Sequence, residues 1–212
     1  IKDTECCARI SADNFVCLLE YESNEAIILR GRAFQKSCEE RLDRIDSRFR
    51  VQFTSAIYKV ARGETDVPSL VGKADIAHKT IGSVHTGSIV FYGDRIQNDF
   101  LRKKKMESAM RLSLKQGDFI IYLQPKIDLL TKEIVGTEAL ARWQHPTEGL
   151  ILPNDFIPLF ESNGFILELD FYVYEKVCQL LRNWTDAGET VMPVSVNVSK
   201  AHLANQHFAA QL

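Results

Sequence analysis

The stretch VGTEALARWQHP, Val135 to Pro146, determines how the second half of the chain folds. It reads as a buried strand, yet it carries Glu138 in its middle and Arg142 four residues later. Alternate strand residues point to one side, so Glu138, Leu140 and Arg142 share a face. The two charges lie about 13 Å apart along the strand, too far for a direct ion pair. Each therefore needs another partner, because a buried charge is costly unless it is paired or bound to metal.

Further strands and helices surround this stretch. The strand FIIYLQPKI precedes it, and only DLLTK separates the two. They should pair antiparallel, because a parallel pair needs a crossover of about a dozen residues. Helices are expected from Pro153, from Leu167 to Trp184 and from near Lys200, with the strand MPVSVNVS before the last of them. This order predicts a right-handed crossover into a mostly parallel sheet.

The strand MPVSVNVS repeats the alternation seen in the first stretch. Val194, Val196 and Val198 share an apolar face, whereas Ser195 and Asn197 share a polar one. Valines under outer helices and polar groups near an inner mouth are typical of a barrel. We therefore predict an α/β fold whose second half is the first part of a (β/α)8-like barrel with an antiparallel first strand.

The first half predicts a second α/β block with the order β-β-α-β-α-β. RISADNFVCLLEY reads as a hairpin, and Asn24 can cap a helix that runs to about Arg44. A half-buried strand over Phe49 to Val60, a helix over Ser69 to Ile81 and the strand SIVFY follow. The segment DRIQNDFLRKKKMESAMRLSLKQ then predicts a connecting helix, with Arg102 to Lys105 on a solvated face.

Composition limits the classes of function. With 212 residues, 45% of them hydrophobic and 25% charged, and a net charge of -2, the chain has the profile of a soluble protein of one or two domains. This argues against binding to nucleic-acid polymers or membrane surfaces. No apolar run reaches the ~18 residues of a membrane span and no signal peptide opens the chain, so we expect a cytoplasmic location. Membrane anchoring through a missing N-terminal region stays open.

Two further features complete the sequence description. The five cysteines include no C-x-x-C pair, which favours reduced core thiols over a disulfide framework or a metal site. The chain begins at Ile1 and stops at HFAAQL, which reads as the interior of a helix. We interpret the sequence as a fragment.

Five short motifs then occur in one order: YLQP, TEALARW, FIPLFESNG, ELDFYVYEKVC and VSVNVS. In order and spacing they resemble the N-terminal part of an EAL domain, the cyclic di-GMP phosphodiesterase fold, over residues 118–212. The resemblance implies hydrolysis of cyclic di-GMP to linear pGpG.

The resemblance also implies roles for individual residues. Glu138 would be a catalytic metal ligand and Asn197 another, and such oxygen ligands suit Mg²⁺ or Mn²⁺. Arg142 would contact a phosphate, Gln124 a guanine edge or ribose, and Leu140 the base pocket. The alternatives for these last residues are structural: an interior hydrogen bond for Gln124, plain core for Leu140, and a barrel-rim hydrogen bond for Asn197.

The other members of the family's metal site decide what the chain can do alone. EAL enzymes also use a later glutamate, an Asp-Asp pair, a lysine and a further acid, and the resemblance places none of them here. We expect the chain by itself to be inactive. The parent protein would be either a phosphodiesterase or a non-catalytic cyclic di-GMP receptor. His145 and Ser199 fit a turn residue and a helix cap better than a ligand and a nucleophile.

The hairpin of the first half resembles the signature of a GGDEF, or diguanylate cyclase, domain. Ser11, Ala12, Asp13, Asn14 and Phe15 stand where Gly-Gly-Asp-Glu-Phe is usual, and ADIAHKTIG resembles a helix near that domain's end. Both glycines and one acid are lost, so we expect no cyclase activity.

The resemblance gives a degenerate GGDEF part over 1–94, a linker helix over 95–117 and the EAL part over 118–212. The family's inhibitory Arg-x-x-Asp site would fall on Lys2 and Glu5. The first part would be a GTP-binding regulatory module or a spacer and dimerisation unit. A homodimer through EAL or upstream regions is expected.

Overall fold

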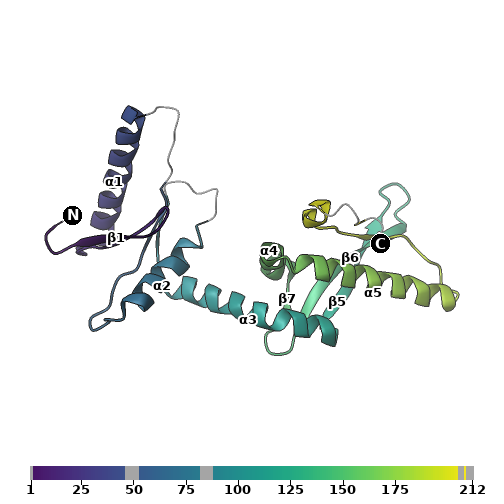
Figure 1. Ribbon diagram of the computed structural model, residues 1–212. Helices are drawn as coiled ribbons and strands as arrows, with labels where there is room; N and C mark the ends of the chain where they lie inside the picture. The colour runs from purple at the N-terminus through teal and green to yellow at the C-terminus, as the bar shows by residue number, and fades with distance from the viewer. Residues whose placement is uncertain (1, 46–52, 82–87, 205–207, 209–212) are drawn as a thin grey trace. The chain divides into compact units, whose positions relative to one another are not determined.

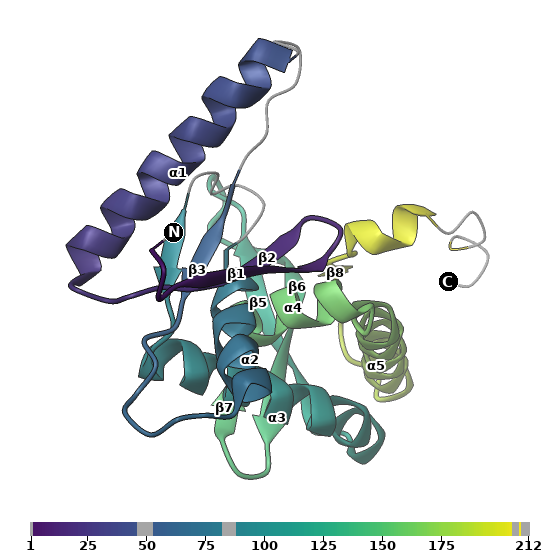
Figure 2. The same ribbon diagram turned by 60° about the vertical axis from the view of Figure 1, so that its left-hand side comes forward.

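The computed structural model describes residues 2–45, 53–81, 88–204 and 208 (Figure 1 and Figure 2). The chain divides into two compact units, Ile1–Leu101 and Arg102–Leu212, and the boundary lies within helix α3, Asp94–Gln116. In the described part of the chain, no helix has both the length and the apolar character needed to cross a membrane.

The first unit has the predicted order of strands and helices. Its elements are the antiparallel strands β1 (Cys6–Ser11) and β2 (Asn14–Leu18), helix α1 (Asn24–Ile45), and the parallel strands β3 (Ser55–Ile57) and β4 (Ile89–Phe91), with helix α2 (Val67–His78) between them. The strand predicted over 49–60 is shorter than expected where it is described, and residues 49–52 lie outside the described residues. Helix α2 also ends before Ile81.

Two local predictions in this unit are wrong. Ser23, not Asn24, caps helix α1, because the Ser23 hydroxyl accepts a hydrogen bond from the Ala26 amide at 3.1 Å. Cys7 and Cys17 form a disulfide rather than staying reduced; they are direct partners across the hairpin, with Cα atoms 4.1 Å apart. Cys6 in this unit and Cys178 in the second unit are exposed and therefore not core thiols.

The second unit is built on a four-stranded sheet. Strand β5 (Phe119–Ile127) pairs antiparallel with β6 (Ile134–His145), which confirms the predicted hairpin. Strand β8 (Val194–Val196) pairs parallel with β6, as the predicted crossover requires, but over the described residues the sheet is mostly antiparallel rather than mostly parallel. The sequence did not predict β7 (Gly149–Ile151), a three-residue strand antiparallel to the end of β6. Closure of this sheet into a barrel stays a prediction.

Helices α4 (Pro153–Asn163) and α5 (Ile166–Asp186) and the end of α3 cover one face of this sheet. Pro153 occupies the first turn of α4, where its missing N–H costs no hydrogen bond, and Gly164 ends the helix with φ 80°. A short 3₁₀ helix, η1 (Lys200–Ala204), stands where the sequence predicted a helix near Lys200.

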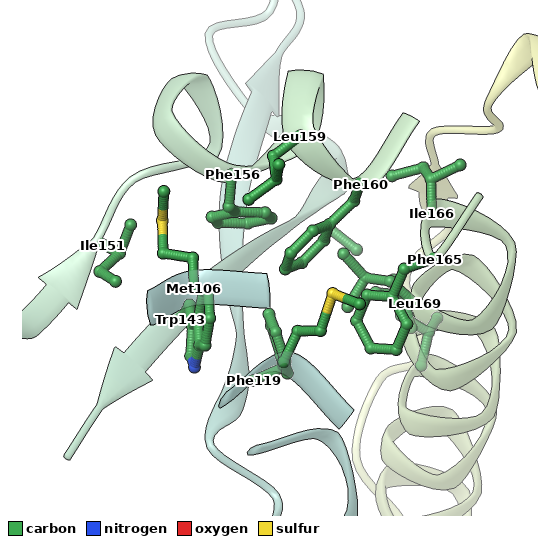
Figure 3. Packing of buried hydrophobic residues seen from close by; sticks show 14 residues of the cluster. Met106, Phe119, Trp143, Ile151, Phe156, Leu159, Phe160, Phe165, Ile166 and Leu169 are labelled. Atoms are coloured by element: carbon green, nitrogen blue, oxygen red, sulfur yellow. The ribbon is translucent and has the colours of Figure 1, made fainter. Parts of the chain in front are cut away.

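The core lies between the sheet and these helices. Phe119 and Trp143 stack with ring centroids 5.1 Å apart, and Phe156 and Phe160 of α4 pack against both (Figure 3). Met106 of α3 fills the same cluster. Aromatic side chains of this size supply most of the burial that holds a small sheet to its helices. The core therefore fixes one face of β6 from Ala139 to Trp143.

Candidate functional site

The opposite face of the sheet carries a row of polar side chains. Gln124, Glu138 and Ser195 are direct partners across β5, β6 and β8, so their side chains share this face. Glu138 is half-buried, and the other two are exposed. Thr137, Ala139 and Trp143 point the other way and are buried. The alternation of β6 therefore follows the predicted parity.

Glu138 and Asn197 come together at the end of β8. The Asn197 side-chain amide donates a hydrogen bond to Glu138 Oε1 at 2.8 Å. Asn197 is the first residue after β8, and β8 is held beside β6 by the pairing of Ser195 with Glu138. A rotation of the Asn197 side-chain amide by a half-turn would exchange its nitrogen and oxygen, so that the oxygen would lie beside Glu138 Oε1. A carboxylate and an amide oxygen are then aimed at one point.

Gly136 allows the chain to reach this position. A Cβ built at Gly136 would lie 2.9 Å from the Pro193 carbonyl oxygen, closer than side-chain carbons approach a backbone atom. The same oxygen accepts a hydrogen bond from the Thr137 amide at 2.9 Å. The glycine of VGTEAL is therefore needed for the close approach of the segment that leads into β8.

Arg142 and Leu140 lie further along the same face of β6. The Arg142 guanidinium carbon stands 5.4 Å from the centre of the Tyr122 ring, and the guanidinium donates to the Ala141 carbonyl at 2.9 Å. Leu140 is the direct partner of Tyr122. Within the described residues, no ion pair joins Arg142 to Glu138, in agreement with the spacing argument.

The structure adds two residues that sequence reasoning missed on this face, Tyr122 and Lys126. Tyr122 lies under Arg142, a cation–π arrangement, and Lys126 Nζ donates to Ser195 Oγ at 2.6 Å. Both have the parity of Gln124 along β5. That parity was available in FIIYLQPKI and would have found them.

His145 and Ser199 have the local roles expected of them. His145 Nδ1 accepts hydrogen bonds from the Thr147 and Glu148 amides at 3.3 and 3.2 Å, which makes it a turn residue. Ser199 Oγ accepts one from the Ala201 amide at 3.3 Å, at the start of η1.

The donor set fits part of a site for a hard divalent cation. Oxygen ligands from carboxylate and amide groups are those that Mg²⁺ and Mn²⁺ prefer. Over the described ranges, however, no group of three or more His, Cys, Asp or Glu side chains is placed to hold a metal. Glu138 and Asn197 by themselves would not complete such a site. An open groove of about 440 Å³ between α3 and α5 includes neither residue.

The hairpin of the first unit has a different arrangement. The Asn14 amide donates to Ser11 Oγ at 3.0 Å and to Asp13 Oδ1 at 3.3 Å, while Arg9 donates to the Ala12 carbonyl. Phe15 is 65% exposed. These side chains hold one another across the turn.

Lys2 and Glu5 are also occupied. Arg30 donates to both oxygens of Glu5 at 2.7 and 2.8 Å, and the backbone amides of Lys2 and Glu20 donate to them as well. The Arg30 guanidinium holds the pKa of Glu5 well below its usual range. Lys2 Nζ pairs with Glu20 at 2.9 Å and with Glu22 at 3.2 Å.

With this geometry established, comparison with known proteins identifies the family. The sequence profile of the EAL domain matches residues 107–212, which is half of the chain. The chain belongs to the EAL domain family. Glu138 is the glutamate of its EAL tripeptide, and Asn197 lies within the matched residues.

Relatives of this EAL chain include two proteins of Pseudomonas aeruginosa. The cyclic di-GMP phosphodiesterase NbdA is 29% identical over 96% of this chain and 26% of its own length. The bifunctional diguanylate cyclase/cyclic di-GMP phosphodiesterase MucR is 26% identical over 93% of this chain and 29% of its own. An uncharacterized protein of Mycobacterium tuberculosis is 40% identical over 49% of this chain and 34% of its own.

The chain spans about a third or less of the length of these curated relatives. Among solved structures, the PaMucR phosphodiesterase in complex with c-di-GMP is 31% identical, with a TM-score of 0.47 over 50% of this chain and 43% of that one.

Proposed function

We propose that this chain is part of an EAL-type phosphodiesterase that hydrolyses cyclic di-GMP to linear pGpG with Mg²⁺ or Mn²⁺. The observation that carries the proposal is the 2.8 Å contact between Glu138 and Asn197 on the open polar face. Both residues lie within the matched EAL segment. The names of NbdA and MucR support the substrate.

In this proposal Glu138 and Asn197 would hold the cation. The cation, when bound, supplies polarisation of the phosphodiester and a lowered pKa for a bound water. Glu138 gives the negative charge that attracts it, and Asn197 gives a neutral oxygen at the same point. Ligands contributed by other residues would complete the site, so we expect these 212 residues assayed alone not to hydrolyse cyclic di-GMP.

The remaining residues of the face would bind the nucleotide. Arg142 presents a guanidinium fork to a phosphate, and the Tyr122 ring beneath it limits the positions that the fork can take. Leu140 offers an apolar surface to a base, and the exposed amide of Gln124 can both donate to and accept from a guanine edge or ribose.

We further propose that the first unit belongs to a degenerate GGDEF domain without cyclase activity. The match to MucR over 93% of the chain supports its kinship with such tandem proteins. Ser11 and Ala12 each carry a Cβ where a GTP-approaching backbone would need glycine. The unit would regulate the phosphodiesterase as a GTP-binding module, or serve as a spacer and dimerisation unit in a homodimer.

The test is a hydrolysis assay on the protein at its natural length. Cyclic di-GMP is incubated with the protein and Mg²⁺, and pGpG is quantified by chromatography beside a sample with EDTA. Metal-dependent pGpG formation is the expected result. Tight binding of cyclic di-GMP without any pGpG would instead assign the chain to the non-catalytic receptors.

A further inference from the structure

We infer that Asp170, on helix α5, is a positioning residue for Asn197, and that it acts by holding the backbone that follows β8. This inference deepens the proposed function, and it rests on that function only for the role of Asn197 as a metal ligand. Asp170 does not belong to the polar row, because it lies on α5, and α5 covers the opposite face of the sheet.

Asp170 stands on a buried part of α5. Its neighbours Leu169 and Val173 are 2% and 6% exposed and belong to the core cluster. Asp170 is itself only 8% exposed. A carboxylate in such a place is costly unless it is hydrogen-bonded, and burial raises its pKa. Its hydrogen-bond partners therefore show what the residue does.

Both of its partners lie in the segment that follows β8. Asp170 Oδ2 accepts a hydrogen bond from the Ser199 amide at 3.0 Å, and His202 Nε2 lies 3.0 Å from the same oxygen. The His202 side chain is 2% exposed, and its ring meets that of Phe171 edge-on at 5.4 Å. The helix thus holds the segment at two points, one backbone and one side-chain.

These contacts confine Asn197 from its C-terminal side. On its N-terminal side, Val196 is paired with Ala139 of β6. Only Asn197 and Val198 lie between that pairing and the Ser199 amide held by Asp170. An exposed residue at the end of a three-residue strand would otherwise fray. The anchor keeps the Asn197 amide beside Glu138.

The test is NMR on the ¹⁵N-labelled protein at its natural length, because these 212 residues would supply only part of the metal site. The Asn197 side-chain NH₂ signals are identified by their loss in Asn197→Ala. Their heteronuclear NOE then reports how ordered the Asn197 side chain is. Mn²⁺ is then titrated, and paramagnetic broadening of these signals reports metal proximity. In Asp170→Ala we expect the NOE to fall to that of a free surface asparagine. The Mn²⁺ concentration for half-broadening should rise about 10-fold, the scale found when a group supporting a metal ligand is removed.

Two further variants sharpen the result. Asp170→Asn keeps an acceptor for the Ser199 amide at nearly the same volume, so it should show a smaller change of the same sign, and it serves if the alanine variant fails to fold. Asp186→Asn is the matched control, because Asp186 is an exposed acid at the end of α5 that pairs with Arg182. It should change neither measurement. The Trp143 indole signal verifies that the core is intact.

Unchanged Asn197 order in Asp170→Ala, with the Trp143 signal intact, would overturn the inference and leave Asp170 as a support for η1 alone. Failure of the proposed function would look different. Mn²⁺ would then leave the Asn197 signals of the unmodified chain unaffected, while the NOE comparison would still decide whether Asp170 positions this residue.

Discussion

The chain contains two antiparallel hairpins, β1–β2 and β5–β6, which use their polar residues in opposite ways. Around the first hairpin the charged groups satisfy one another, as in the pairing of Glu5 with Arg30. On β6, Glu138 and Arg142 share a face but not an ion pair, and the other face of the strand is locked into the core. Paired charges have a structural use, whereas charges held apart on a fixed strand remain available to a ligand.

The difference has an energetic side. A ligand that binds Glu5 must displace a bidentate arginine, whereas a cation that binds Glu138 displaces only an amide hydrogen bond, and the same Asn197 side chain can turn to ligate it. A hydrogen bond to a charged group contributes about 1.5–3 kcal/mol, and the Glu5 carboxylate accepts four such bonds, whereas the Glu138 carboxylate accepts one from Asn197. A ligand therefore loses less free energy in displacing existing hydrogen bonds at Glu138 of the second hairpin than at Glu5 beside the first.

The largest expected effect tests the fixed face of β6. Trp143→Ala should lower the free energy of unfolding by about 3–5 kcal/mol, because it removes a fully buried indole that touches Phe119 and Phe156. Phe15→Ala, in the first hairpin, should change it by about 0.5 kcal/mol or less, since that ring is 65% exposed. Urea denaturation followed by circular dichroism measures both. Equal losses would remove the contrast between the hairpins.

The next effect concerns the metal. In the protein at its natural length, Glu138→Gln should lower turnover by a factor of about 100 or more, because it removes the charge of a metal ligand while the pocket keeps its shape. Binding of cyclic di-GMP, measured by calorimetry with Ca²⁺ in place of Mg²⁺ to suppress hydrolysis, should persist. Glu133→Gln, an exposed glutamate before β6, is the control and should retain full turnover. Parental turnover in Glu138→Gln would return this residue to a structural role.

A smaller effect is expected for the arginine. Arg142→Ala should weaken cyclic di-GMP binding by about 1.5–3 kcal/mol, the scale of a hydrogen bond to a charged group, with metal binding retained. Arg9→Ala is a matched control, because Arg9 stands 5.7 Å from the centre of the Phe15 ring much as Arg142 stands over Tyr122. Calorimetric titration in Ca²⁺ measures both variants. An equal loss in both would mean that the effect is not specific to the polar face.

Much of this contrast could be predicted from the sequence. The side-chain period of a strand is fixed, so the shared face of Glu138 and Arg142 followed from spacing alone. The short DLLTK connection likewise required the antiparallel pairing of β5 and β6.

Register and long-range contacts could not be predicted. A bulge between Arg9 and Ser11 shifts the first hairpin by one residue and brings Cys7 opposite Cys17. Without the bulge, the pairing of Ser11 with Asn14 would continue to place Cys7 opposite Leu18. Asp170 was missed because Ser199 reaches it only through the crossover from α5 to β8.

A pH effect probes the self-paired charges of the first unit. Glu64 accepts hydrogen bonds from Tyr58 at 2.5 Å and from the Ala61 amide at 2.8 Å, and it pairs with Lys73. The Lys73 ammonium, first among these, lowers the pKa of Glu64 to about 2. A carboxyl whose folded-state pKa is depressed stabilises the fold above its unfolded pKa of ~4.3, and this contribution is lost as pH falls toward the folded value.

Glu64→Gln should therefore reduce the fall in melting temperature between pH 4.5 and pH 2, about the window set by the two pKa values. Glu39→Gln, an exposed glutamate on α1, serves as the control and should follow the parent chain. Thermal scans at several pH values measure both. If the Glu64→Gln and parent curves are parallel across this window, the Glu64 cluster contributes nothing that depends on its charge.

The smallest expected effect is none at all, and it tests the first hairpin directly. Purified protein incubated with GTP and Mg²⁺ should form no cyclic di-GMP above a sample without protein. The reason is local: Ser11 and Ala12 place Cβ atoms where a nucleotide would approach the backbone, and the Asn14 amide is held by Ser11 and Asp13. Asn14 also lacks the negative charge that a metal-bound triphosphate site needs.

Because any phosphodiesterase activity would consume the product, the assay uses the Glu138→Gln variant and also quantifies pGpG. Cyclic di-GMP or pGpG formed from GTP would show that a hairpin whose polar groups satisfy one another can still open for a ligand, and the contrast between the two hairpins would then fail.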